Sequence, residues 1–369
     1  MMRMKKKNAV IWLCLFAALF ILPQLLYPLV KPYLDTENTE NRILAEKPTL
    51  TLDNFESFPA DYESYYNDTM PYRNQLIRLN NTLQYFLFKQ QDINGVAIGR
   101  DGWLFYCSEE AGNPVNQSLG CWHFSDEELK SMGDSMQLTK DTLAERGIEF
   151  VLFIPPNKET IYMEKLPSYY EQQDEYTATD QLVDYLKEHT DVAIVYPKSE
   201  LLEYKENHPD MQLYLKLDSH WNNLGAYIGA KSLAHALGIE MPDAESIGLT
   251  KMQKTSGDLA VVMNAAVTDV DIDYELSGIT ELNTETIKDD EQSETVFLTR
   301  GADKRNIFVA RDSYSVALAP ILASQFENST FVHHTLFSQD QIFAADADIY
   351  VLEIVERNEY QIPMYSVSP

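Results

Sequence analysis

Three residues in this sequence have the types and settings needed for serine-based acyl chemistry. Asp218 and His220 are two residues apart in the run DSHW at 218–221, and Ser313 lies in the run RDSY at 311–314. A serine hydroxyl becomes a good nucleophile when an adjacent imidazole takes its proton. A carboxylate close to that imidazole holds it in the tautomer that accepts the proton. The set predicts attack by Ser313 on an acyl carbonyl, with His220 as the base and Asp218 as its orienting acid.

Ser313 lies at a predicted turn between a strand at 306–310 and a helix at 314–326. Its own N–H belongs to the unpaired first turn of that helix. Such a donor stabilises an oxyanion by about 3 kcal/mol where this has been measured. The alternative for Ser313 is a plain helix N-cap or a buried hydroxyl.

Four further residues are candidates for the oxyanion site or the substrate pocket. Asn157 follows a predicted strand at the same sheet edge and could donate its side-chain amide to the oxyanion. Tyr314 and Trp221 could form a pocket wall or bind sugar, and the alternative for both is packing in the core. Arg311, in the run RDSY, is assigned to the same pocket.

The histidines at 333 and 334 suggest a competing hypothesis. With Asp218 and His220 they would make a His/His/Asp set that suits zinc or iron. No pair among these residues has the i, i+4 spacing of ligands on one helix. The serine-based reading is therefore preferred, and neither a metal nor another cofactor is expected.

The elements around these residues alternate between strands and helices from residue 125 onward. The predicted strands are 149–154, 192–196, 212–217, 306–310, 330–333 and 348–355, and the predicted helices are 125–146, 175–189, a short one before 212, 222–237 and 314–326. Such alternation is typical of an α/β sandwich with a mainly parallel central sheet. Ligands of these sheets bind at the carboxyl ends of the strands. Residues 241–300 are acidic and weakly patterned, so no structure is assigned to them.

The N-terminal part of the chain contains a long apolar run. Ala9–Val30 is uncharged and mostly apolar, and its length meets the ~20 residues of a transmembrane helix. Four cations precede it within the first seven residues, so the N-terminus is expected in the cytoplasm and the rest outside. A cleaved signal peptide is the alternative, but the run exceeds the ~7–15 residues of a signal core and no A-x-A site follows. Beyond it we expect helices at 53–66, with Asp53 as N-cap, and from 72 to about 91, then short strands at 95–99 and 103–106.

Composition narrows the possible partners. Lys and Arg total 29 and Asp and Glu total 57, which gives a formal net charge of −28. A surface this acidic repels phosphate backbones, so nucleic-acid binding is not expected. Outside the apolar run there are two cysteines, Cys107 and Cys121. In an oxidising compartment they could form a disulfide worth roughly 3 kcal/mol, and two free thiols are the alternative.

Several short motifs occur in a fixed order along the chain. They are ENR at 40–42, ND at 67–68 with PYR at 71–73, GRDGWLF at 99–105, PNK at 156–158 with Tyr162, DSHWN at 218–222 with LGAY at 224–227, RDSY at 311–314, and Glu353 with ER at 356–357. Together they resemble the SGNH-hydrolase-like proteins of bacterial exopolysaccharide O-acetylation, of the AlgX/AlgJ type, and their DHHW relatives.

The resemblance implies a three-layer α/β/α sandwich with a circularly permuted motif order, because Asp218 and His220 precede Ser313. It implies a membrane-anchored O-acetyltransferase that works through an acetyl-serine on hydroxyls of a cell-surface or exported polysaccharide. An MBOAT-type membrane acyltransferase would supply the acetyl group. The expected domains are a cytoplasmic tail (1–8), a transmembrane anchor (9–30), a stalk with the N-terminal helices (31–92) and the SGNH-like domain (93–369).

The chain also departs from that family pattern. Ser219 replaces the second letter of DHHW. The acidic net charge makes an acidic polymer such as alginate an awkward acceptor, so a neutral or amino-sugar glycan is expected. Two alternatives stay open: an acetyl esterase of the same fold, and a non-catalytic glycan-binding scaffold of the modification complex.

Overall fold

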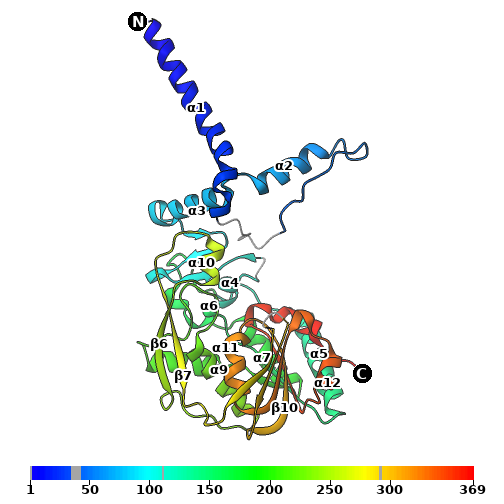
Figure 1. Ribbon diagram of the computed structural model, residues 1–369. Helices are drawn as coiled ribbons and strands as arrows, with labels where there is room; N and C mark the ends of the chain where they lie inside the picture. The colour runs from blue at the N-terminus through cyan, green and yellow to red at the C-terminus, as the bar shows by residue number, and fades with distance from the viewer. Residues whose placement is uncertain (1, 35–42, 110–111, 291–292) are drawn as a thin grey trace. The chain divides into compact units, whose positions relative to one another are not determined.

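A seven-stranded sheet forms the centre of the larger structural unit in the computed structural model (Figure 1). Its strands are β4 (Glu149–Phe153), β5 (Ala193–Val195), β8 (Thr284–Asp289), β9 (Glu294–Thr299), β10 (Asp303–Arg311), β11 (Phe326–His333) and β12 (Ile349–Glu353). They are ordered β5-β4-β12-β10-β11-β9-β8. Neighbours are parallel from β5 to β11, and β9 is antiparallel to both β11 and β8. The prediction of a mainly parallel central sheet is confirmed.

The structure describes residues 2–34, 43–109, 112–290 and 293–369. The larger unit comprises Gln91–Ala260 and Thr268–Pro369, and the smaller one comprises Met1–Gln90 and Val261–Val267. The motif at 40–42 lies outside the described residues.

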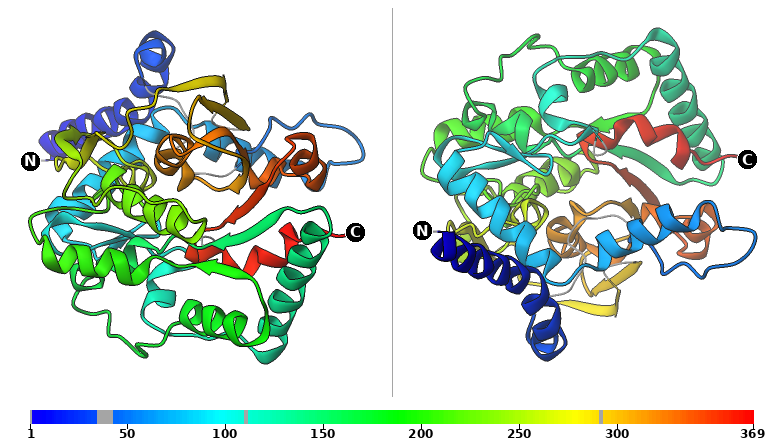
Figure 2. Two further views of the ribbon diagram at one scale, coloured as in Figure 1. Left: turned by 90° about the horizontal axis from the view of Figure 1, so that it is seen from below. Right: turned by 90° about the horizontal axis from the view of Figure 1, so that it is seen from above.

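Helices cover both faces of the large sheet. The longer ones in this unit are α5 (Asp126–Ala144), α7 (Ala178–His189), α8 (Lys198–Asn207), α9 (Asn223–Ala236), α11 (Ser315–Ala323), α12 (Gln339–Ala344) and the 3-10 helix η7 (Glu356–Tyr365). Side chains of α8, α9 and α11 belong to one hydrophobic core, and those of α5, α7, α12 and η7 belong to a second. Figure 2 shows η7, in red, beside α5. The result is a three-layer α/β/α sandwich.

The strand residues are distributed between the two cores according to the period of two of a β-strand. In β4, Val151 and Phe153 belong to the core with α9, and Phe150 and Leu152 belong to the core with α5. Because both faces are buried, β4 is a continuous apolar run rather than an alternating one, as expected for a parallel sheet.

Polar caps set the helix starts that the sequence predicted. Ser125 and Glu128 form a reciprocal capping box at the start of α5, and Thr177 and Asp180 form another at the start of α7. These caps satisfy backbone N–H groups that a helix leaves unpaired. Asn222 caps α9 by accepting from the N–H groups of two residues in its first turn.

The predicted strand at 212–217 is wrong. The segment is irregular, and its one β-bridge joins Tyr214 to Trp221. Two of its backbone N–H groups are paired with side chains, and the Lys216 carbonyl accepts from the N–H of Leu104 in a short strand outside the large sheet. The N–H of Leu213 donates to the Tyr162 hydroxyl, and the N–H of Leu217 donates to Asp271. This local pairing leaves the segment as a loop.

Residues 241–300, to which no structure was assigned, contain β8, β9 and a separate two-stranded sheet of β6 (Gly248–Lys254) and β7 (Asp271–Ser277). Most side chains of β6 and β8 are exposed, so these strands carry little of the apolar signal that reveals a strand in sequence. The remaining short elements are β1 (Asp92–Ile93), β2 (Val96–Ile98), β3 (Leu104–Tyr106), η3 (Arg100–Gly102), α4 (Pro114–Ser118), α6 (Lys158–Ile161), η5 (Met163–Lys165), α10 (Asp258–Met263) and η6 (His334–Leu336).

The smaller unit is helical. It contains α1 (Met2–Val30), η1 (Lys31–Tyr33), α2 (Phe58–Thr69), α3 (Arg73–Leu83) and the π-helical turn η2 (Gln84–Phe88). Within the described residues, one helix is long and apolar enough to cross a membrane, over Ala9–Tyr33. The start predicted for the next helix is wrong: α2 begins at Phe58 after Ser57, not after Asp53, because Pro59 suits the first turn.

Candidate active site

Ser313, His220 and Asp218 are connected by hydrogen bonds in the structure. Ser313 Oγ lies 2.7 Å from His220 Nε2, and His220 Nδ1 lies 2.6 Å from Asp218 Oδ1. Ser313 follows the carboxyl end of β10, and the other two residues come from the loop between α8 and α9. The fold thus brings together side chains 93 residues apart, in the arrangement that serine nucleophiles use.

The ionisation of Asp218 fixes the tautomer of His220. Burial disfavours the charged form of the Asp218 carboxyl. Hydrogen bonds from His220 and from the Asp258 N–H, together with the charge of His220, outweigh burial and hold the Asp218 pKa well below its usual range. An ionised carboxylate only accepts hydrogen bonds, so Nδ1 of a neutral imidazole carries the proton. Nε2 then presents its lone pair to the Ser313 hydroxyl, as a general base must.

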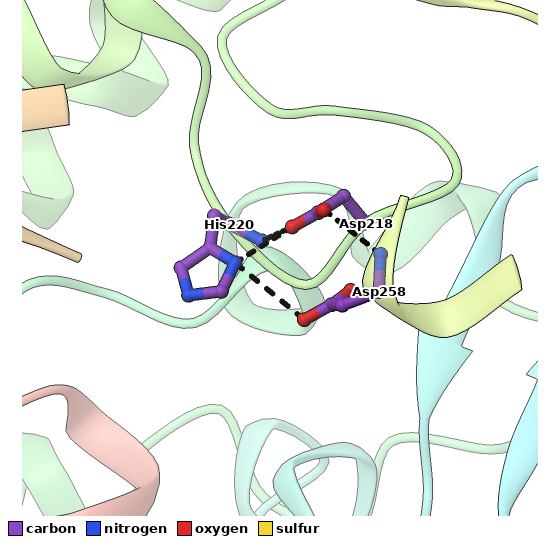
Figure 3. Close-up of side chains that lie close together, drawn as sticks. All are labelled: Asp218, His220 and Asp258. Carbon is purple, nitrogen blue, oxygen red and sulfur yellow. Dashed lines mark hydrogen bonds and ion pairs between the residues drawn. The ribbon is translucent and has the colours of Figure 1, made fainter. Parts of the chain in front are cut away.

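Asp258 is a second carboxylate beside the imidazole (Figure 3). Its Oδ2 lies 3.5 Å from His220 Nδ1 and accepts from Ser219 Oγ at 2.5 Å, and its Oδ1 accepts from the Ser219 N–H at 2.6 Å. Its own N–H donates to Asp218 Oδ2 at 2.9 Å. Asp258 therefore holds the loop that carries the Asp–His pair. Ser219, the departure from the DHHW pattern, is one of its attachment points.

Lys158 also contacts the loop that carries Asp218 and His220. Its side chain is fully buried, and Nζ donates to three backbone carbonyls of the loop, at 3.2 Å to Leu215, 3.3 Å to Lys216 and 2.5 Å to Asp218. Burial lowers the Lys158 pKa, and the negative charges of Glu159, Asp258 and other nearby carboxylates oppose this. The Lys216 carbonyl also accepts from the Leu104 N–H at 2.9 Å, so Lys158 adds a second donor there. The sequence analysis listed Lys158 within a motif but gave it no role.

The carboxyl groups of Asp312 and Glu353 accept hydrogen bonds within the turn at 311–315, which carries Ser313. The Asp312 carboxylate accepts from the N–H of Tyr314 at 2.8 Å and of Val355 at 2.7 Å. The Glu353 carboxyl accepts from the Asp312 N–H at 2.7 Å and from Ser315 Oγ at 3.0 Å. Among the described residues, the N–H of Ser313 has no hydrogen-bond acceptor, so it is left free at the site.

Glu353 is expected to make stability depend on pH. Its burial, and then the adjacent Asp312 charge, raise its pKa well above the ordinary value. The folded chain therefore keeps a proton that the unfolded chain has lost above about pH 4.3. Stability should fall as pH rises through this interval, by up to about 1.4 kcal/mol per pH unit for this proton. Glu353→Gln, which resembles the neutral acid, should remove that part of the slope.

Denaturant unfolding from mildly acidic to mildly alkaline pH measures this slope. Glu353→Ala serves as the comparison, because it should lose stability at every pH by leaving the Asp312 N–H unpaired. An unchanged slope in Glu353→Gln would show that Glu353 does not hold the extra proton.

The other predicted pocket residues lie mostly in the interior. Trp221 and Tyr314 are buried in the core; Tyr314 donates to the Ser219 carbonyl and Trp221 donates to the Tyr314 carbonyl. Asn157 is fully buried, and its amide nitrogen donates to Gln117. Arg311 lines a cavity of about 200 Å³ together with Ser315 and Val316, close in sequence to Ser313. Their roles in an oxyanion site or pocket stay predictions.

The acidic-histidine group in the structure differs from the set considered as the metal-binding alternative. Among the described residues, the group with metal-ligand geometry is Asp218, His220 and Asp258, without His333 or His334. Both ring nitrogens of His220 already have hydrogen-bonding partners in the protein. His334 is buried and stacks on Tyr365.

Cys107 and Cys121 are free thiols in the structure, not the disulfide that was considered. Cys107 is half-buried against the core and hydrogen-bonded with Tyr170, whereas Cys121 is exposed. Burial is the main cause that raises the Cys107 pKa to about 11, so its thiol is held in the unreactive protonated form.

The three-layer sandwich with its Ser–His–Asp geometry has the fold of an SGNH-hydrolase-like protein. A family model described as "SGNH hydrolase-like domain, acetyltransferase AlgX" matches residues 96–333. That is well over half of the chain, and the chain belongs to this family.

The relatives are consistent with this assignment. The chain is 28% identical over 183 residues to the probable alginate O-acetylase AlgJ of Pseudomonas aeruginosa PAO1, a match that covers 49% of this chain and 41% of the relative. The chain is also 26% identical over 175 residues to the Pseudomonas putida KT2440 protein of the same name. That match covers 47% of this chain and 42% of the relative. The chain thus spans less than half the length of these relatives.

Two solved structures share the fold. A DHHW family protein from Eubacterium siraeum has a TM-score of 0.55 at 15% identity and covers 75% of this chain and 97% of that chain. Bacillus cereus PatB1 has a TM-score of 0.53 at 17% identity and covers 70% and 95%. The circularly permuted motif order remains a prediction.

Proposed function

We propose that this protein is an extracytoplasmic, serine-dependent O-acetyltransferase that acetylates hydroxyls of a cell-surface or exported polysaccharide. The observation that carries the proposal is the 2.7 Å separation of Ser313 Oγ from His220 Nε2, in a chain of the AlgX acetyltransferase family. The relatives named as probable alginate O-acetylases support the transfer of acetyl groups to a glycan.

The reaction would run through two acyl transfers. Ser313 Oγ attacks the acetyl carbonyl while His220 Nε2 takes the hydroxyl proton, and the Ser313 N–H is proposed as a donor to the developing oxyanion. The intermediate collapses to acetyl-Ser313, and the leaving group takes the proton from His220. A sugar hydroxyl then attacks the acetyl-serine and gives its proton to His220. Release of the acetylated sugar returns the proton to Ser313 Oγ.

The proposed acceptor is a neutral or amino-sugar glycan, because a net charge of −28 repels a polyanion. The proposed anchor is the apolar helix at Ala9–Tyr33, with the basic N-terminus in the cytoplasm. An MBOAT-type membrane acyltransferase is proposed as the acetyl supplier.

The function is tested with purified protein, a chromogenic acetyl ester and a neutral oligosaccharide. We expect an acetylated peptide that contains Ser313 by mass spectrometry, together with acetylated oligosaccharide. Acetate as the sole product would favour the esterase alternative, in which water takes the acyl group. Folded protein that forms neither adduct nor product, with this donor and with a membrane fraction supplying acetyl, would overturn the proposal in favour of the scaffold.

Asp258 is expected to act by positioning the Asp–His pair. Asp258→Asn removes one of two carboxylates facing His220 and one acceptor of Ser219. We expect kcat to fall by about tenfold to a hundredfold with little change in KM, since small misplacements of catalytic groups have effects of this size.

Asp243→Asn is the matched control, because Asp243 is an exposed partner of Lys231 and has no contact with the site. A wild-type kcat in Asp258→Asn would contradict a positioning role for Asp258. Loss of soluble folded protein would instead assign it a purely structural one.

A further inference from the structure

Helix α3 and the turn η2 present large apolar side chains to solvent. Five of them lie along one face at spacings of one, three or four residues and form the apolar stripe. They are Leu76 (50% exposed), Leu79 (56%), Leu83 (42%), Phe86 (45%) and Leu87 (67%). The buried residue of α3 is instead polar. This residue, Asn81, donates to the Met263 carbonyl at 2.9 Å. A soluble helix has the reverse arrangement, and an exposed apolar patch of this kind marks an interaction surface.

The segment formed by α3 and η2 is positively charged, whereas the chain as a whole is negatively charged. Residues 73–89 include Arg73, Arg78 and Lys89 and contain no Asp or Glu, although the chain has 57 acidic and 29 basic residues. An apolar stripe flanked by cations is typical of helices that lie in the interface of an anionic membrane.

A contact within the smaller unit places α3 at the end of the candidate membrane span. Tyr27, in the last part of that span, packs edge-on against Tyr72 with the ring centroids 5.2 Å apart. Tyr72 directly precedes α3, and Figure 1 shows α3 beside the end of α1. Tyrosines concentrate where a membrane-spanning helix reaches the headgroups. The start of α3 is therefore held at headgroup depth when α1 is inserted.

We propose that α3 and η2 lie in the headgroup region of the leaflet where α1 ends, with the apolar stripe towards the acyl chains. Arg78 and Lys89 then face anionic headgroups. The proposal rests on the proposed membrane anchor. It adds a second lipid contact, which limits how far the segment after the anchor can leave the bilayer. A protein partner would also cover an apolar face, but the local positive charge and the Tyr27 contact favour lipid.

The test uses the full chain in phosphatidylcholine–phosphatidylglycerol nanodiscs, with an environment-sensitive dye on single cysteines and doxyl-labelled lipids as quenchers. Leu79→Cys and Leu83→Cys, in a background where the native cysteines are serine, report the stripe. Native Cys14, kept as the single cysteine, reports α1. Lys130→Cys, on the exposed face of α5, reports solvent.

We expect shallow-position quenching at 79 and 83, deep quenching at Cys14 and none at 130. Quenching at Cys14 without quenching at 79 and 83 would overturn this proposal and leave the anchor standing. Absence of quenching at every position would overturn the anchor and this proposal together.

Lipid charge provides a second measurement. In the Leu79→Cys protein, Arg78→Gln with Lys89→Gln should weaken docking on anionic nanodiscs by about fivefold per cation, and much less on neutral ones. Lys187→Gln, a cation on α7, is the matched control and should change nothing. An effect of the double variant that is equal on both membranes would overturn the headgroup contact.

Discussion

Ser313→Ala is expected to lower kcat for acetyl-ester turnover by roughly 10⁶-fold, the size of effect seen when a serine nucleophile is removed from a catalytic triad. The change deletes one half-buried hydroxyl and leaves His220 and Asp218 in place, so the fold should survive. The acetylated peptide seen with wild-type protein should disappear with the activity. Both are measured in one experiment, by chromogenic assay and by mass spectrometry of the digested protein.

Ser324→Ala is the control for this variant. Ser324 is a buried serine directly after the same helix, α11, and its hydroxyl donates to the Ile321 carbonyl. It should retain turnover close to wild type. Substantial turnover by Ser313→Ala, with an adduct on another residue or none, would remove Ser313 as the nucleophile.

Asp218→Asn has the second-largest expected effect, a loss of about 10⁴-fold in kcat. The asparagine amide can donate to His220 Nδ1, which stabilises the tautomer with its proton on Nε2. That nitrogen then faces Ser313 with a proton instead of a lone pair. Because the Asp218 pKa is held well below its usual range, the wild-type carboxylate stays ionised on mild acidification.

Asp269→Asn is the matched control. Asp269 pairs with Lys216 on the same loop, at 3.0 Å, but has no contact with His220. It should behave like wild type if the loss in Asp218→Asn arises from the tautomer of His220. Equal losses in both variants would mean that disturbance of the loop, and not the imidazole, limits turnover.

The residues Asp218, His220 and Ser313 could be found in the sequence because Asp218 and His220 are two residues apart and Ser313 directly follows a predictable strand, β10. Asp258 could not be predicted in the same way. It lies in a segment without hydrophobic periodicity, and its contacts with Ser219 and His220 exist only once the chain is folded. Lys158 was missed because a lysine is rarely buried, and nothing local indicates that three carbonyls surround its ammonium.

The strands of the sheet likewise include some that the sequence predicts and some that it does not. β4 and β10 were predicted because both faces of each strand are apolar, and β8 was not because nearly all of its side chains are exposed. The apolar residues at 213–217 imitate a strand. Their backbone groups are paired with Tyr162, Asp271 and Lys158, which sequence periodicity does not report.

The position of β12 in the sheet affects when a newly synthesised chain can complete its sheet. This strand comes late in the chain, yet it lies between β4 and β10 and pairs with both. Until β12 has been synthesised, no strand lies between β4 and β10 to join the pair β4–β5 to the pair β10–β11. Contacts this distant in sequence form slowly. A chain that ends before β12 therefore lacks the strand that connects β4 with β10, the strand before Ser313.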